Sequence, residues 1–164
     1  MQAQADREAL LAQLAVAETD ALTAARTRQA GLADLEHEIE RTQRTTGLLS
    51  IAYVDVIGLK ALNDSQGHAA GDALLTSVVA VIREHLRSYD LIIRLGGDEF
   101  LCAMSNMALH EAHERFAQVA AALAPRPDAR AIRTGFAALK PDENAPELIA
   151  RADRALLDTG ARRR

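Results

Sequence analysis

The sequence predicts an α/β domain in which helices flank a central mixed β-sheet, preceded by an N-terminal helix. Apolar segments with the composition of strands alternate with longer segments whose apolar residues recur at helical spacing. The 164 residues are 49% hydrophobic, which is enough for one domain to bury a core. The order strand, helix, hairpin, helix, strand, helix after residue 47 is typical of one sheet covered by helices.

Two helices are predicted ahead of the sheet. The first covers residues 5 to about 20, which are rich in the helix formers Ala, Leu, Glu and Gln. Its apolar residues follow a 4-3-4 spacing and form a short seam: Leu10, Leu14, Ala17 and Ala21. A seam this short does not establish a coiled coil, and a plain amphipathic helix is favoured over one. The second helix is predicted over residues 28–44, with Gly47 ending it.

The rest of the chain alternates strands and helices. A strand is predicted over 48–56 because Leu, Ile, Val and Tyr are dense there. Two short strands at 91–95 and 100–104 flank Gly96-Gly97, which is typical of a hairpin turn. A last strand is predicted over 131–139. Helices are predicted at 71–86, 108–123 and 146–157 from their apolar spacing and the prolines near their ends.

Composition and charge exclude several functional classes. A net charge of -4 and the absence of Trp argue against a nucleic-acid binder, which needs a basic face and stacking aromatics. No apolar stretch approaches the roughly 20 residues of a membrane helix, and no secretory signal is visible at the N-terminus. The single cysteine, Cys102, cannot form an internal disulfide, which favours a reducing, cytoplasmic location.

Three carboxylates fall where predicted strands end. Asp55 closes the strand at 48–56, and Asp98 and Glu99 lie at the tip of the predicted hairpin. If the two strands are neighbours, Asp55 and Asp98 converge, and close carboxylates need a cation between them. Oxygen ligands suit Mg²⁺ or Mn²⁺. Taken alone, Gly-Gly-Asp is also ordinary turn chemistry.

A polar segment at 60–72 lies between these carboxylates. Its Gly, Asn, Asp and Ser residues predict a loop followed by a helix with a capping acid. The same segment also offers groups that suit a nucleotide. Lys60 can meet a phosphate as a point charge, and Asn63 and Asp72 carry the amide and carboxylate that read a guanine edge.

Several motifs, in order and at matching spacing, resemble the GGDEF domain family. They are Asp20-Ala21-Leu22-Thr23, Val54-Asp55-Val56, the polar run at 63–72 and Leu95-Gly96-Gly97-Asp98-Glu99-Phe100. The resemblance implies a palm-like nucleotide-cyclase fold over 20–164 and a signalling or dimerisation helix at 1–19. It also implies a diguanylate cyclase, which condenses two GTP into cyclic di-GMP and pyrophosphate. Because one domain holds one GTP and the product has two linkages, a homodimer is expected.

The resemblance implies roles for the residues at the strand ends. Asp55, Asp98 and the backbone carbonyl of Val56 would bind the catalytic Mg²⁺ or Mn²⁺. Glu99 would assist deprotonation of the ribose 3′-hydroxyl or share a metal. Gly96-Gly97 would leave room for the nucleotide against the hairpin, where a side chain would intrude.

The resemblance also implies how the substrate is held. Asn63 and Asp72 would bind the guanine. Lys60 and the backbone amides near Gly58 and Leu59 would bind the triphosphate.

A second ligand site is implied by Arg87-Ser88-Tyr89-Asp90. As a pattern alone, Arg-x-x-Asp is an ordinary helix end with a solvated arginine. Its position upstream of Gly96 resembles the product-binding inhibitory site of the family. Arg87 would then form a fork with a guanine edge or phosphate, and Asp90 would accept hydrogen bonds from guanine.

The sequence departs from the family pattern at several positions. Ile57 replaces the second acid of the usual Asp-x-Asp, Leu59 replaces Phe, and Leu95 stands where Tyr is common. Gly160 lies at or near the position of the phosphate-binding lysine, and the arginines at 162–164 are candidates to supply the charge instead. The alternative function is therefore a catalytically weak GGDEF domain that acts as a receptor or regulatory module binding cyclic di-GMP or GTP.

Overall fold

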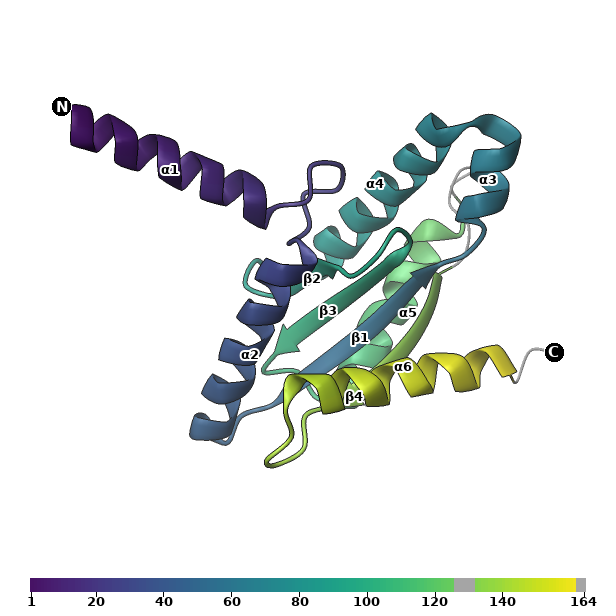
Figure 1. Cartoon of the computed structure of the whole chain (residues 1–164). Helices are drawn as coiled ribbons and strands as arrows, with labels where there is room; N and C mark the ends of the chain where they lie inside the picture. Colours follow the sequence, from purple (N-terminus) through teal and green to yellow (C-terminus); the bar gives the residue numbers. More distant parts are fainter. Residues whose placement is uncertain (126–131, 162–164) are drawn as a thin grey trace.

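The computed structural model describes residues 1–125 and 132–161, shown in Figure 1. Its elements, in chain order, are α1 (Gln2–Glu18), α2 (Arg28–Thr45), β1 (Leu49–Val56), α3 (Leu59–Gln66), α4 (His68–His85), β2 (Leu91–Arg94), β3 (Glu99–Ser105), α5 (Leu109–Leu123), β4 (Ile132–Ala138) and α6 (Ala145–Ala161). The predicted α/β class with flanking helices and an N-terminal helix is confirmed.

The four strands form one sheet in the order β2-β3-β1-β4. All three strand pairs are antiparallel, so the prediction of a mixed sheet was wrong. Within the described residues, parallel pairing is confined to an isolated bridge between Arg26 and Ile93. The parallel expectation failed because alternation of strands and helices does not by itself define strand direction; direction depends on where each connection re-enters the sheet.

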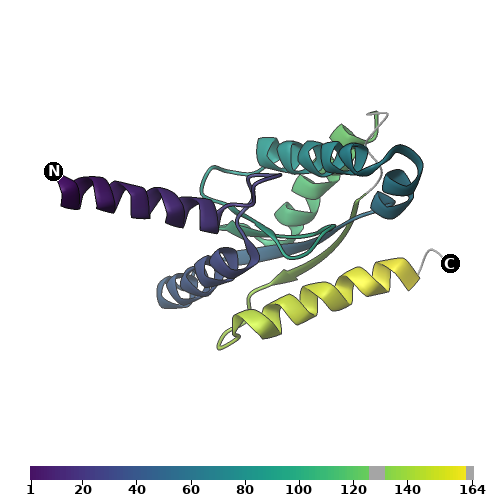
Figure 2. The same ribbon diagram turned by 45° about the horizontal axis from the view of Figure 1, so that its top comes forward.

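Both faces of the sheet are covered by helices. Figure 2 shows α4 and α6 on opposite sides of it. One core joins Ala52 and Val54 of β1 to α4 and α5, and the other joins Ile51 of β1 to α2 and α6. Because successive strand residues point to opposite faces, burial on both faces explains the nearly continuous apolar composition of β1. Each fully buried Leu, Ile or Phe stabilises the fold by about 1.5–3 kcal/mol.

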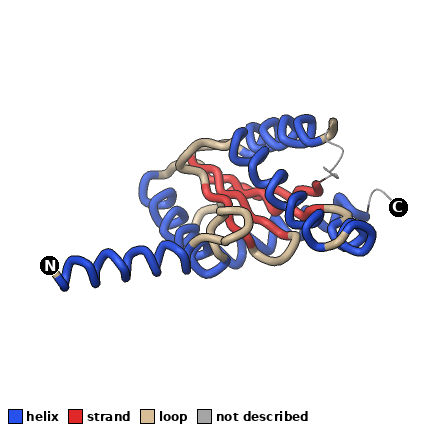
Figure 3. The backbone as a smooth tube through the Cα atoms, turned by 90° about the horizontal axis from the view of Figure 1, so that it is seen from above, coloured by secondary structure: helices blue, strands red, loops and turns tan. Residues whose placement is uncertain are grey.

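Helix α1 extends away from the sheet, as Figures 1 and 3 show. Leu10, Leu11 and Leu14 remain 57%, 55% and 47% exposed, so this helix does not pack its apolar side on the domain. The predicted seam is also shorter, because α1 ends at Glu18 and Ala21 lies in the following turn. Within the described residues, no helix has the length and apolar character needed to cross a membrane.

One helix was not predicted. The segment expected to be a loop forms α3, Leu59–Gln66, and α4 begins at His68 rather than residue 71. The Asn, Asp and Ser residues of α3 favour turns, but burial of Leu62 against the core outweighs that local preference. The flanking Gly58 and Gly67, both with positive φ, were the available signal for a short separate helix. The first residue of the last predicted strand, Ala131, lies outside the described residues.

Candidate active site

The carboxylates predicted to converge, Asp55 and Asp98, lie at one end of the two central strands, where β1 ends and β3 begins. This end of the sheet is called the acidic edge. β1 and β3 are neighbours, with Asp55 directly opposite Glu99. The backbone N–H of Val56 donates to the carbonyl of Asp98 at 2.9 Å. The turn before β3 closes with a hydrogen bond of 2.9 Å from the Leu95 N–H to the Glu99 carbonyl. Tight pairing of β1 with β3 therefore determines the spacing of these acidic residues.

The turn at Gly96-Gly97 is held by Arg94, a residue for which the sequence analysis predicted no role. Its guanidinium donates to the carbonyls of Gly96 and Gly97 at 3.2 and 3.0 Å and to the Asp20 carboxylate at 3.1 Å. A Cβ at Gly97 would meet no atom within 4 Å, and one at Gly96 would lie 3.5 Å from Glu99 Oε2. Because the chain itself leaves this space open, the absence of side chains suits a ligand against the turn.

Asp20 connects the turn to the segment after α1. Its carboxylate accepts hydrogen bonds from the Thr23 backbone N–H at 2.9 Å and from the Thr23 hydroxyl at 2.7 Å. Partial burial acts to raise the pKa of Asp20, but the bonds from Thr23 and Arg94 outweigh it and lower that pKa. The carboxylate is thus held ionised between two elements. An arginine at the end of a short apolar strand was the sequence signal for this link.

The acidic residues differ in their partners. Asp55 faces Arg133 across β1 and β4, and their side chains form an ion pair at 2.5 Å. Glu99 Oε2 accepts a hydrogen bond of 3.2 Å from the Tyr53 hydroxyl. Burial, together with the charge of Glu99, raises the pKa of Tyr53 to about 12, so the phenol stays a hydrogen-bond donor at neutral pH. Tyr53 therefore orients the Glu99 carboxylate, a role the sequence alone did not indicate.

The donor set at this edge fits a magnesium or manganese ion. Among the described residues, no three His, Cys, Asp or Glu side chains cluster as a ready-made metal cage. Mg²⁺ commonly uses only one or two carboxylates and takes its remaining ligands from water and substrate phosphates. The oxygens of Asp55, Asp98 and the Val56 carbonyl match that requirement. A metal ion at Asp55 would have to displace the guanidinium of Arg133, which now pairs with this carboxylate.

The predicted guanine-binding residues lie on the two helices that follow β1. Asn63 is on α3 and Asp72 is on α4, and these helices pack against each other. The Asn63 side chain rests on Gly71, where an added Cβ would fall on its amide. Among the described residues, Asn63 Oδ1 is buried without a hydrogen-bond partner. An atom of this kind costs about 1–3 kcal/mol while it lacks a donor.

The start of α3 is open to an anion. Gly58 precedes the helix with φ 81° and ψ 14°, and no side chain caps the helix N-terminus. The free amides of the first turn and the helix dipole favour a phosphate there. Leu59 begins the helix and the exposed Lys60 follows it. The predicted phosphate-binding groups are therefore placed together by one helix start.

The Arg87–Asp90 corner lies at the opposite end of β3, beside Ser105. Asp90 accepts from the Arg87 backbone N–H at 2.9 Å and from the Ser105 backbone N–H at 3.3 Å. The Arg87 guanidinium donates to the Ser105 carbonyl at 2.9 Å and to the Tyr89 hydroxyl at 2.8 Å. Burial raises the pKa of Asp90 despite these bonds. The structure brings the pair together, but both side chains already have partners.

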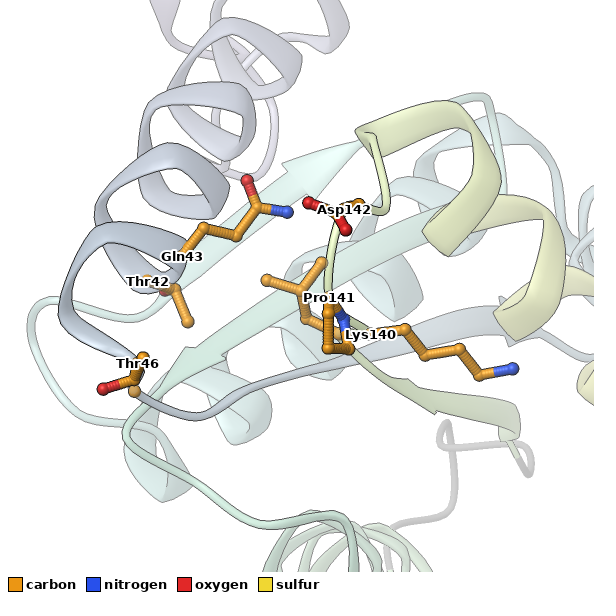
Figure 4. Close-up of a pocket in the computed structure, with 8 residues that line it drawn as sticks. Thr42, Gln43, Thr46, Lys140, Pro141 and Asp142 are labelled. Carbon is orange, nitrogen blue, oxygen red and sulfur yellow. The ribbon is translucent and has the colours of Figure 1, made fainter.

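A pocket of about 300 Å³ lies away from all these residues, and Figure 4 shows its lining. Thr42, Thr46 and Gly47 border it on one side, and Lys140 and Pro141 on the other. It is located where β1 begins and β4 ends, whereas the acidic residues lie where β1 ends. The pocket therefore belongs to the opposite end of the sheet from the candidate active site.

Comparisons with known proteins identify the family to which this fold belongs. A family model described as "Diguanylate cyclase, GGDEF domain" matches residues 17–164. The chain is 32% identical over 145 residues to the diguanylate cyclase DgcP of Pseudomonas aeruginosa, with 84% of this chain covered. It spans only 22% of the length of DgcP.

Solved structures give the same result. The coiled coil and GGDEF domain of DgcB from Caulobacter crescentus, solved in complex with c-di-GMP, superposes with a TM-score of 0.92 at 25% identity. That match covers 98% of this chain and 89% of the other. The diguanylate cyclase SiaD from Pseudomonas aeruginosa, solved with its activator SiaC, matches with a TM-score of 0.82 at 30% identity. That match covers 98% of this chain and 64% of the SiaD chain. By its fold, its acidic hairpin and these matches, the chain belongs to the GGDEF domain family.

Proposed function

We propose that this protein is a diguanylate cyclase that condenses two GTP into cyclic di-GMP and pyrophosphate. The observation that carries the proposal is the buried, unpartnered Asn63 Oδ1 on the helix that directly follows β1 and its terminal Asp55. A group that needs a hydrogen-bond donor thus lies close in the chain to a carboxylate suited to a metal. A nucleotide with its Mg²⁺ satisfies both.

The reacting atoms are handled by the acidic edge. Asp55, Asp98 and the Val56 carbonyl would hold Mg²⁺ or Mn²⁺. When bound, the ion lowers the pKa of a hydroxyl beside it and neutralises charge on the α-phosphate. Glu99, oriented by Tyr53, accepts the proton from the ribose 3′-hydroxyl of the second GTP. The 3′-oxygen then bonds to the α-phosphorus as the bond to pyrophosphate breaks.

The rest of the substrate is held by α3 and α4. Asn63 and Asp72 bind the guanine edge, with the Asp72 carboxylate accepting from the ring N–H and exocyclic amine. The triphosphate is bound by the amides at Gly58 and Leu59 and by Lys60. Gly96 and Gly97 leave space for the nucleotide at the hairpin.

The active unit is a homodimer, because each domain supplies one GTP and the product has two linkages. Helix α1 provides the contact between two copies. Its exposed Leu10, Leu11 and Leu14 are the apolar surface available for pairing. Light scattering on the protein and on Leu10→Gln/Leu14→Gln tests this, and we expect the variant to be monomeric. Wild-type protein that stays monomeric at micromolar concentration would contradict it.

Product regulates the enzyme through Arg87 and Asp90, which bind guanine and phosphate groups of cyclic di-GMP. The reaction takes place in the cytoplasm, where GTP and reduced thiols occur. A second function is favoured by one feature, the missing side chain at Gly160. It is a catalytically weak domain that binds cyclic di-GMP or GTP as a receptor.

Incubation with GTP and Mg²⁺ distinguishes these functions. We expect pyrophosphate and cyclic di-GMP to accumulate, and neither to form when ATP replaces GTP or when the metal is chelated. Binding of cyclic di-GMP without any synthesis, at protein concentrations that support dimers, would favour the receptor. Absence of both binding and synthesis would refute the assignment to this chemistry.

A further inference from the structure

We propose that Arg133 is a triphosphate-binding residue that exchanges the carboxylate of Asp55 for the phosphates of GTP, in the space above the side-chain-less Gly160. The inference rests on the proposed function, because it assumes that GTP and Mg²⁺ bind at Asp55. It adds a substrate-binding residue on β4, a strand to which no site residue had been assigned.

The first step is the close packing of α6 on β4. A Cβ at Gly135 would fall on the backbone of α6, on the Ala152 carbonyl oxygen and the Leu156 nitrogen. Gly160 lies one helical turn beyond Leu156, or about 6 Å along the helix. Arg133 lies two residues before Gly135, or about 7 Å along the strand. The two equal steps bring Gly160 beside Arg133.

The contact between these positions is direct. A Cβ built at Gly160 would lie 3.2 Å from Arg133 Nη1. The guanidinium therefore occupies the volume into which a side chain at position 160 would extend. Arg133 Nη1 is the end of a flexible side chain, so a side chain at position 160 would move the guanidinium slightly rather than be excluded by it. Position 133 thus delivers a positive charge where position 160 lacks one.

The electrostatics favour exchange over a permanent ion pair. Arg133 meets Asp55 through one guanidinium nitrogen, and its side chain is 43% exposed. The Asp55 side chain is 16% exposed, and because the arginine reaches solvent, the pair is partly screened and stabilises the fold less than a fully buried pair. A divalent ion on Asp55 would neutralise that carboxylate and repel the guanidinium, while the phosphates that accompany the ion attract it. A guanidinium fork also matches two phosphate oxygens better than it matches a single carboxylate contact.

Calorimetry with the intact protein tests the proposal without turnover. The probes are a GTP analogue with a non-cleavable methylene between the α- and β-phosphorus atoms, and GMP, both with Mg²⁺. We expect Arg133→Ala to lose about ten- to hundred-fold in affinity for the analogue, the size of a charge-assisted contact, and to bind GMP as the wild type does. The matched control is Arg154→Ala, an exposed arginine on α6, which should bind both probes normally.

A rescue and a metal titration sharpen the test. Arg133→Ala/Gly160→Lys should recover most of the lost affinity, because the lysine enters the vacated space. Titration with Mn²⁺ without nucleotide, followed by electron paramagnetic resonance, should show tighter Mn²⁺ binding by Arg133→Ala, since the cation competing for Asp55 is removed. A merely structural role for Arg133 does not predict the rescue by lysine at position 160, whereas tighter Mn²⁺ binding shows only that Arg133 and the metal compete for Asp55.

The outcomes are distinguishable. Equal affinities of Arg133→Ala and wild type for the analogue would overturn the role of Arg133 and leave the proposed function intact. Equal losses for the analogue and GMP would also overturn it, because the effect would not be specific to the outer phosphates. A loss confined to a variant with the arginines at 162–164 replaced would assign the charge to them instead. If the wild type binds neither probe, the proposed function fails as well.

Discussion

Two arginine–carboxylate pairs lie at opposite ends of the sheet and are built differently. Glu143, in the β4–α6 loop, is 7% exposed, and its two oxygens receive Arg151 Nη2 at 2.6 Å and Nε at 2.7 Å. Arg151 also donates to the Ala138 carbonyl, and the Lys140 N–H donates to Glu143. Asp55 and Arg133 share a single contact, and the arginine is 43% exposed.

The difference in burial and contact number between the two ion pairs indicates a structural role for one and a proposed functional role for the other. The Glu143–Arg151 pair satisfies its own polar groups, so it holds a loop and leaves little for a ligand to add. Asp55 makes a single ion-pair contact, and Asn63 Oδ1, on the helix α3 that follows β1, has no hydrogen-bond partner among the described residues. A pair that is bidentate and buried stabilises the fold, whereas a single exposed contact is free to be replaced by a metal and its phosphates.

The largest effect is expected at the acidic edge, on activity alone. Asp98→Ala or Glu99→Gln should lower cyclic di-GMP synthesis by at least about a thousand-fold, because metal binding or proton transfer is lost. Thermal unfolding should stay close to wild type, since neither residue is in the core. Product formation by liquid chromatography and a melting curve check both statements. Turnover like wild type in either variant would remove these residues from the mechanism.

At the β4–α6 loop we expect a loss of stability, whereas at the acidic edge we expect a loss of activity with stability unchanged. Arg151→Ala leaves the Glu143 carboxylate buried and should lower the free energy of unfolding by about 3 kcal/mol. Arg133→Ala, the matched control at the more exposed pair, should lower it less, by about 1 kcal/mol, because Arg133 is 43% exposed and solvent screens the contact. Urea denaturation measures both. Similar losses in the two variants would contradict the distinction between the pairs.

The same pair has a defined pH dependence. The hydrogen bond from Arg151 outweighs burial and holds the pKa of Glu143 below its ordinary value. A carboxyl with a lowered folded-state pKa stabilises the fold above its unfolded pKa of about 4.3 and loses that contribution as the pH falls through the folded value. The difference in stability between wild type and Arg151→Ala should therefore shrink at acid pH. A difference that stays constant down to the acid transition would argue against the ionised pair.

The preference for guanine over adenine tests the proposed base-binding site at Asn63 and Asp72. GTP should be preferred over ATP by about 1–3 kcal/mol, or roughly five- to 150-fold, because adenine places an acceptor nitrogen against Asp72. Asp72→Ala should lose most of this preference, whereas Asp64→Ala, exposed on α3, should keep it. Competition binding with the two nucleotides measures the ratio. Equal product from ATP and GTP in the wild type would be inconsistent with the guanine assignment.

The smallest effect is expected at Arg87, which has features of both pairs because it holds structural contacts and is also a proposed ligand-binding residue. Its guanidinium already bonds to the Ser105 carbonyl and the Tyr89 hydroxyl, so cyclic di-GMP must displace existing contacts. Arg87→Ala should therefore lose about ten-fold in product affinity, the lower end for a charge-assisted contact. Synthesis should continue and become less sensitive to product, and Arg83→Ala on α4 should behave as wild type. Unchanged affinity by calorimetry would leave Arg87 with a structural role only, joining the segment after α4 to Ser105.

Much of the fold was predictable because local patterns carry it. The apolar density of β1, the helical spacing in α4 and α5 and the Gly96-Gly97 turn each indicate an element within its own segment. Helix α3 escaped prediction because its polar residues favour turns, and only the burial of Leu62 reverses that preference. The antiparallel direction of every strand pair likewise depends on connections that local pattern does not describe.

The sequence by itself determined which side chains we propose for the chemistry: Asp55, Asp98 and Glu99 at strand ends, and Asn63 and Asp72 on the segment between them. These residues can be recognised from the sequence because each lies in a short motif whose spacing does not depend on the tertiary structure. Only the tertiary structure decided that Arg133, 78 residues from Asp55, faces it across two strands, and that α6 brings Gly160 against the same guanidinium. Strand register and close helix–strand packing are long-range properties, set by how the core closes rather than by the residues beside each position in the chain.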